Sequence, residues 1–145
     1  MDTRNWLKRA FYADKKVKAL DLLVKQCRER AEGINGKPKG DRGKSDSTAN
    51  STELSLLKLA ELTESLERQK AELIQITDEI SKTIAQLHDD DLETVLIHRY
   101  LLFHTVEQTA EILGYSVRAV KYKQNQAIEK LCTFLPCFAL SNVIQ

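Results

Sequence analysis

The chain has 145 residues, of which 42% are hydrophobic and 30% charged, and its formal net charge is +1. That charge excludes an overall electrostatic attraction to nucleic acid, so any such interface must come from cations placed together locally. No apolar run approaches the roughly 20 residues of a membrane span, and the first residues lack a secretory signal pattern. We therefore expect a cytoplasmic protein with no membrane partner.

The scarcity of helix-breaking residues predicts an all-α fold. The sequence has 2 prolines, and four of its 5 glycines fall between residues 33 and 43. Long uninterrupted helices are therefore expected on either side of that segment. The three cysteines, Cys27, Cys132 and Cys137, have the spacing of neither a disulfide framework nor a metal site. We interpret them as small hydrophobic residues in a reducing compartment.

The first segment has a heptad pattern, in which apolar or small residues recur at alternating spacings of three and four. Its positions are Thr3, Trp6, Ala10, Ala13, Val17, Leu20, Val24, Cys27, Ala31 and Ile34. This pattern predicts a helix with a seam about five heptads long. Residues 35–52 are rich in Gly, Ser, Asn and charge, and we expect them to form a flexible loop.

A second heptad run follows that loop, with Asn50 and Glu53 as the predicted cap of its helix. Its seam positions are Leu59, Leu62, Leu66, Gln69, Leu73, Ile76, Ile80, Thr83 and Leu87. Residues 1–34 hold nine Lys and Arg against five Asp and Glu, whereas residues 53–88 hold four against seven. We expect residues 1–88 to form a coiled-coil-like arm. The economical interpretation is an antiparallel helical hairpin, and the alternative is a homodimer in which one or both seams pair between chains. Both can hold at once, because a two-helix hairpin has a small core.

Residues 89–131 contain the signals of further, shorter helices. Asp90 and Glu93 have capping-box spacing and predict a helix over about 91–103, and Thr105 with Gln108 repeats the signature for a helix that ends at Leu113. Gly114 suits a left-handed residue that ends this helix, and Ser116 suits the cap of a final helix over about 117–131. This order predicts a helix-turn-helix, followed by an apolar tail at 132–145.

The expected buried side of this helix-turn-helix consists of Val106, Ala110, Leu113, Val120, Ala127, Ile128 and Leu131. On the outer side, Arg118, Lys121, Tyr122 and Asn125 follow the i, i+3, i+4, i+7 spacing of one helix face. Arg118 and Lys121 suit guanine acceptors or phosphates, Asn125 suits adenine, and Tyr122 suits phosphate or sugar.

Three more residues complete the predicted DNA-binding set. Ser116 and the exposed N–H groups at the helix start suit one phosphate, and Val117 lies beside them. We assign a flanking phosphate contact to Lys123.

The stretch TVEQTAEILGYSVRAVKYKQNQAIEKL, residues 105–131, resembles the promoter-binding region 4 helix-turn-helix of the sigma-70 family. Over residues 1–131 the layout is similar to small phage-encoded transcriptional regulators of the RinA-like and ArpU-like kind. The resemblance implies a regulator that binds double-stranded DNA in a bacterial host cell, with RNA polymerase as a further partner. The sequence departs from the region 4 pattern at Thr109, which replaces an apolar residue, and at Lys123, which stands at a normally buried position.

Two other functions remain open from the sequence. A small-terminase-like subunit for DNA packaging also joins a helix-turn-helix to helical segments, but assembles as a ring. A region-4-like module that binds only protein would suit the acidic stretch 89–93.

Catalysis is not expected from this sequence. His88, His98 and His104 lack the spacing of a metal site, and we interpret each as a cap or surface residue. Three consecutive aspartates, Asp89 to Asp91, are typical of a solvated helix start. No glycine-rich phosphate loop occurs in a strand–helix context. We therefore expect no enzyme activity and no metal or other cofactor.

Overall fold

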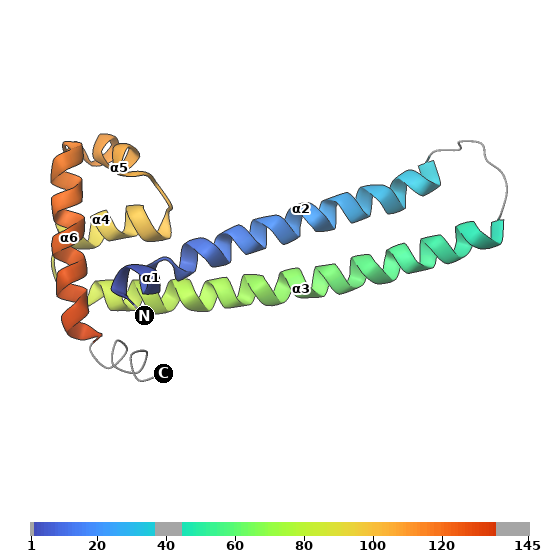
Figure 1. Cartoon of the computed structure of the whole chain (residues 1–145), viewed down its shortest axis with the longest axis horizontal. Helices are drawn as coiled ribbons and strands as arrows, with labels where there is room; N and C mark the ends of the chain where they lie inside the picture. Colours follow the sequence, from blue (N-terminus) through green and yellow to red (C-terminus); the bar gives the residue numbers. More distant parts are fainter. Residues whose placement is uncertain (1, 37–44, 136–145) are drawn as a thin grey trace. The chain divides into compact units, whose positions relative to one another are not determined.

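The structure, a computed structural model, describes the backbone of residues 2–36 and 45–135 and the side chains of 2–32 and 53–135. Along the chain its elements are α1 (Thr3–Leu7), α2 (Arg9–Gly36), α3 (Ser45–Ala85), α4 (Asp90–Leu96), the π-helical η1 (Ile97–Leu101), α5 (Val106–Leu113) and α6 (Val117–Phe134), as Figure 1 shows. No strand occurs in these ranges, which confirms the all-α class. None of the described helices has the length and apolar character that crossing a membrane requires.

The chain divides into two compact units. The first comprises Met1–Ala13 and Leu73–Gln145, and the second comprises Asp14–Glu72. This division differs from the expected boundary at residue 88, because both ends of the predicted arm belong to the C-terminal unit. The physical reason is burial: Trp6 and Leu7 from the start of the chain share one core cluster with Ile84, Leu96 and Leu131.

In the second unit, α2 and α3 lie side by side and run in opposite directions (Figure 1). A shallow pocket has Cys27 and Arg30 of α2 on one side and Leu54, Ser55 and Lys58 of α3 on the other. The predicted seam positions of this unit whose side chains are described are buried or half-buried, and these are Val17, Leu20, Val24, Cys27, Ala31, Leu59, Leu62, Leu66 and Gln69. The side chain of Ile34, a further predicted seam position, lies outside the described residues. This burial is compatible with a helical hairpin. Pairing of the same seam positions between two chains stays a prediction.

The expected loop over 35–52 is shorter in the structure. Helix α2 continues to Gly36 and α3 begins at Ser45, so the chain between them is 37–44, which lies outside the described residues. Asn50 is therefore inside α3 and does not begin it, contrary to the predicted cap with Glu53. Extending a helix adds one hydrogen bond for each residue ordered, which favours helix over loop once a long helix already exists.

The first unit is built around α6, which packs against α1, α4 and α5. Its main core cluster contains residues of α1, α2, α3, α4, η1 and α6 but none of α5. The members are Trp6, Leu7, Ala10, Ile80, Ile84, Leu87, Leu92, Leu96, Tyr100, Ala127, Ile128 and Leu131. Burying each large aliphatic side chain of such a cluster contributes roughly 1.5–3 kcal/mol. This core fixes the orientation of α6 and thus decides which of its sides stays in water.

The helix expected over 91–103 has a different cap and a different end. Its N-cap is Asp89, whose Oδ1 atom accepts hydrogen bonds from the backbone N–H groups of Asp91 and Leu92, at 3.1 and 3.3 Å. Glu93 accepts from the backbone N–H of Asp89, so the predicted capping pair of Asp90 with Glu93 is wrong by one residue at the cap. The last turn then widens into the π-helix η1, and the chain leaves it through Phe103, which has a positive φ of 60°.

Helix α6 runs three residues beyond the predicted end at 131, to Phe134. Cys132 therefore lies on this helix, where its Sγ atom is 2.9 Å from the hydroxyl of Thr3 on α1. Cys27 and Cys132 are both free thiols. The predicted tail from Pro136 onward, including Cys137, lies outside the described residues.

Candidate nucleic-acid interface

The turn between α5 and α6 has the local geometry that its residues predict. Thr105 and Gln108 form a capping box at the start of α5, in which each side chain accepts a hydrogen bond from the other residue's backbone N–H. Gly114 ends α5 in the left-handed conformation, with φ 75° and ψ 27°. Ser116 then caps α6 by accepting a hydrogen bond from the backbone N–H of Ala119 at 3.0 Å. These three caps set where each helix begins or ends.

A second, smaller core cluster holds α5 and α6 together over α4. It consists of the buried residues Val95, Ala110 and Val120, against which Val106, Leu113 and Tyr115 pack from the edge. Ala110 is only 5% exposed, as expected where two helices cross closely. Thr109, the polar departure from the region 4 pattern, is fully buried, and its hydroxyl donates to the backbone carbonyl of Thr105 at 2.9 Å. That bond satisfies the hydroxyl inside an apolar cluster.

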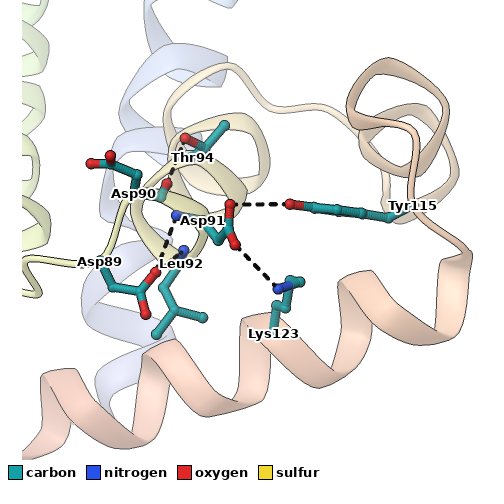
Figure 2. A network of polar contacts seen from close by, with 7 residues as sticks. All are labelled: Asp89, Asp90, Asp91, Leu92, Thr94, Tyr115 and Lys123. Atoms are coloured by element: carbon teal, nitrogen blue, oxygen red, sulfur yellow. Dashed lines mark hydrogen bonds and ion pairs between the residues drawn. The ribbon is translucent and has the colours of Figure 1, made fainter.

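Asp91, at the start of α4, connects the turn with α6. Figure 2 shows its carboxylate between the hydroxyl of Tyr115 and the ammonium group of Lys123. The Tyr115 hydroxyl donates to Oδ1 at 3.2 Å, and the Lys123 Nζ atom is 3.6 Å from Oδ2. Lys123 also lies 5.1 Å from the centre of the Tyr115 ring, in cation–π contact. The three side chains therefore bridge α4, the turn and α6 on one side of the crossing.

Arg99, on the π-helix, makes the corresponding connection on the other side. Its Nε atom donates to Oε1 of Gln124 on α6 at 2.7 Å, and its Nη1 atom donates to the backbone carbonyl of His104 at 2.7 Å. Gln124 is 7% exposed, so this amide oxygen is satisfied inside the protein. The sequence did not lead us to predict this pair. Burial of Gln124 could have been predicted from its position, because it lies four residues after Val120 and three before Ala127 on the buried side of the helix.

His98 and His104 form a pair, which corrects the interpretation of each as an isolated cap or surface residue. Their Nδ1 atoms are 3.0 Å apart and both side chains are half-buried. The π-helical turn and the positive φ of Phe103 fold the chain back so that the two rings meet. Burial lowers the pKa of His98 below its ordinary value of 6.5, and the charge of His104 lowers it further.

The outer face of α6 presents cations and a tyrosine to water. Arg118, Lys121, Tyr122 and Asn125 are exposed, with Tyr122 at 68%. Ser116 and Val117 are also exposed, at the start of the same helix. Within the described residues, the side chains of Arg118 and Lys121 have neither a hydrogen bond nor an ion pair. Two positive charges without carboxylate partners on one helix face are free to meet an anion.

Besides Ser116, whose hydroxyl caps α6, two of the predicted DNA-binding residues are engaged within the protein. The Lys123 side chain is 26% exposed and pairs with Asp91, so it lies on the flank of α6 toward α4 and not on the outer face. This placement differs from the flanking phosphate contact that we assigned to it. Asn125 stays on the outer face, but its Oδ1 atom accepts a hydrogen bond from Nη2 of Arg4 on α1. Sequence analysis missed Arg4, because nothing in its local pattern indicates which helix α1 packs against.

The described residues contain no group of three or more His, Cys, Asp or Glu side chains arranged to hold a metal ion. Comparison of the chain with protein-family models, with curated proteins and with solved structures found no significant match.

Proposed function

We propose that this chain is a sequence-specific DNA-binding transcriptional regulator that inserts the start of α6 into the major groove. The observation that carries the proposal is the exposed face of α6, where Arg118 and Lys121 have no partner among the described residues while the opposite side of the helix is buried. Arginine and lysine at such positions pair with guanine acceptors and phosphates. The phage or prophage character of the regulator rests on the similarity of the layout of residues 1–131 to small phage-encoded transcriptional regulators.

The electrostatics of the site support DNA through local placement and not through net charge. The acidic cluster Asp89–Asp91 lies at the start of α4, where Asp89 caps the helix and Asp91 pairs with Lys123. Its negative charge is thus partly neutralised, and among the described residues it forms no ion pair with Arg118 or Lys121. The contacts of Asp91 with Lys123 and of Arg99 with Gln124 hold α6 in place, which reduces the ordering cost when the helix binds.

The test is a selection of bound sequences from random duplex DNA with the full-length protein, followed by affinity measurements on the enriched duplex. We expect the Arg118→Ala/Lys121→Ala variant to bind that duplex at least tenfold more weakly, because each good contact to a base is worth about 1–3 kcal/mol. Lys130→Ala is the matched control, since Lys130 is exposed on α6 but lies off the outer face. Equal affinity of the double variant and the wild type would exclude this face.

For the arm we propose self-association or docking on RNA polymerase. The motivating observation is that large aliphatic side chains are exposed on both of its helices, namely Leu22, Leu23, Leu54, Leu56 and Leu57. Mass measurement in solution separates the candidates. A monomer or dimer is expected of a regulator, whereas a large ring would favour the packaging function. Retained polymerase binding without any DNA binding at low salt would favour the protein-interaction module.

A further inference from the structure

The side chains of Arg4 and Asn125 meet at the end of the exposed face of α6. Arg4 lies on α1, which packs on α6, and its Nη2 atom donates to Oδ1 of Asn125 across 121 residues of sequence. Two neighbours of Arg4, Trp6 and Leu7, are almost fully buried in the main core cluster. The position of Arg4 beside α6 is thus set by packing, even though the hydrogen bond itself is exposed.

The chemistry of the guanidinium group decides the orientation of the Asn125 amide. Arginine has five N–H donors and no acceptor, so the amide must turn its carbonyl oxygen toward Arg4 and its NH₂ group away. Reading adenine requires the amide oxygen to accept from the adenine amino group while the NH₂ group donates to N7. With Arg4 beside that oxygen, an adenine amino group would approach a positive charge. The remaining polar groups of the pair, the other N–H groups of Arg4 and the NH₂ group of Asn125, are all donors, which suits a ligand made only of acceptors.

The position of Asn125 along α6 indicates which acceptors these are. Helix α6 begins at Val117, and in helix-turn-helix proteins the residues at the start of the recognition helix contact base edges. Asn125 is more than two turns further on, where the helix leaves the groove and the sugar–phosphate backbone is the nearer ligand. Glu129, four residues later on the same side, is exposed and negative, and so ends the anion-binding part of the face.

We propose that Arg4 and Asn125 together bind one phosphate of the DNA backbone, which makes α1 part of the interface. This inference rests on the proposed function. One N–H of the charged guanidinium group and one N–H of the amide can each donate to a phosphate oxygen, and hydrogen bonds to an ionised acceptor belong to the stronger class. The contact positions α6 on the duplex and carries no sequence information. It replaces the adenine contact expected of Asn125.

Arg4 also interacts with Tyr100, and this second contact limits the entropy lost on binding. Tyr100 is buried, and that burial raises the pKa of its hydroxyl, whereas the charges of Arg4 and Arg99 act in the opposite direction. A guanidinium group that interacts with both a buried phenol and an amide loses less rotamer freedom when a phosphate arrives.

The experiment measures the dissociation constant of the full-length protein over a series of salt concentrations. The probes are the duplex enriched by the wild type and a scrambled duplex of the same composition. Arg4→Gln should weaken binding to both duplexes by the same factor and reduce the slope of log affinity against log salt by about 0.9, the value for one phosphate contact. Arg4→Lys should retain the wild-type slope because it keeps the charge. The matched control is Lys130→Gln, an exposed cation of α6 off this face, which should leave the slope unchanged.

A second selection uses Asn125→Ala, a surface substitution that tests the same contact without removing a charge. We expect it to return the wild-type motif. Two results would overturn the phosphate contact while leaving the proposed function intact. One is a salt slope of Arg4→Gln equal to that of the wild type. The other is a motif selected by Asn125→Ala that lacks the wild-type base preference at one position. If the wild type bound neither duplex even at low salt, both proposals would fail. Thermal melting of each variant checks that it is folded.

Discussion

The Oδ2 atom of Asp91, in the first turn of α4, lies 3.6 Å from the Nζ atom of Lys123 in the middle of α6. This ion pair joins the acidic run at 89–91 to the helix that carries the exposed cations. It explains how a lysine can occupy position 123, which is normally buried in the region 4 pattern. The aliphatic part of the Lys123 side chain is largely buried, and its ammonium group reaches the carboxylate of Asp91.

Asp91→Asn should lower the free energy of unfolding by more than Asp90→Asn does. Both changes remove a carboxylate from the first turn of α4, where negative charge is favourable by about 0.3–1 kcal/mol. Only Asp91 also pairs with Lys123, and a partly exposed pair of this kind adds at most about 1 kcal/mol. Urea denaturation of both variants measures, by difference, what the contacts of Asp91 with Lys123 and Tyr115 contribute together. Equal losses would mean that the ion pair contributes nothing measurable.

Gly114→Ala should destabilise the protein by roughly 1–2 kcal/mol, the cost of placing a side chain in the left-handed region. No atom lies within 4 Å of a Cβ added at Gly114, so the cost comes from the φ of 75° and not from a clash. Gly114→Asn should lose less, because asparagine tolerates this conformation better. Denaturation curves of the two variants provide the comparison. If alanine were no worse than asparagine, the backbone argument would not hold.

Arg99→Met should cost about 1–3 kcal/mol, because it leaves the buried amide oxygen of Gln124 and the carbonyl of His104 without their donor. Gln124→Met in the same background should restore part of that loss by removing the unsatisfied amide. A double-mutant cycle on the free energy of unfolding measures the coupling between the two side chains. Additive effects of the two substitutions would argue against a direct interaction.

The stability of the protein should fall as the pH drops below about 6.5, the ordinary pKa of histidine. The pKa of His98 is lowered in the folded chain, first by burial and then by the charge of His104. The unfolded chain therefore takes up the proton more readily, so the contribution of His98 is complete above the unfolded pKa and is lost as the pH falls toward the folded one. Melting temperatures from pH 7.5 to 5.5 measure this. His98→Asn should flatten the dependence, and an unchanged pH dependence in this variant would contradict the role of His98.

Local sequence determined the features that depend on neighbouring residues. The capping box of Thr105 with Gln108, the left-handed Gly114 and the cap at Ser116 all follow from hydrogen bonds and φ preferences within a few residues. Periodicity likewise separated the exposed face of α6 from its buried side, because a regular helix places residues three and four apart together. The cap of α4 was missed by one residue, since three consecutive aspartates offer equivalent side chains.

Tertiary structure alone decided which elements those helices meet. A heptad pattern states that Thr3, Trp6 and Ala10 are buried but not what covers them, and in the fold they join the unit that contains α6. The contacts Arg4–Asn125, Asp91–Lys123 and Arg99–Gln124 connect residues far apart in sequence, and no local preference encodes such pairs. They arise because packing of the shared core brings α1, α4 and η1 to α6, after which charge and hydrogen-bonding capacity select the partners.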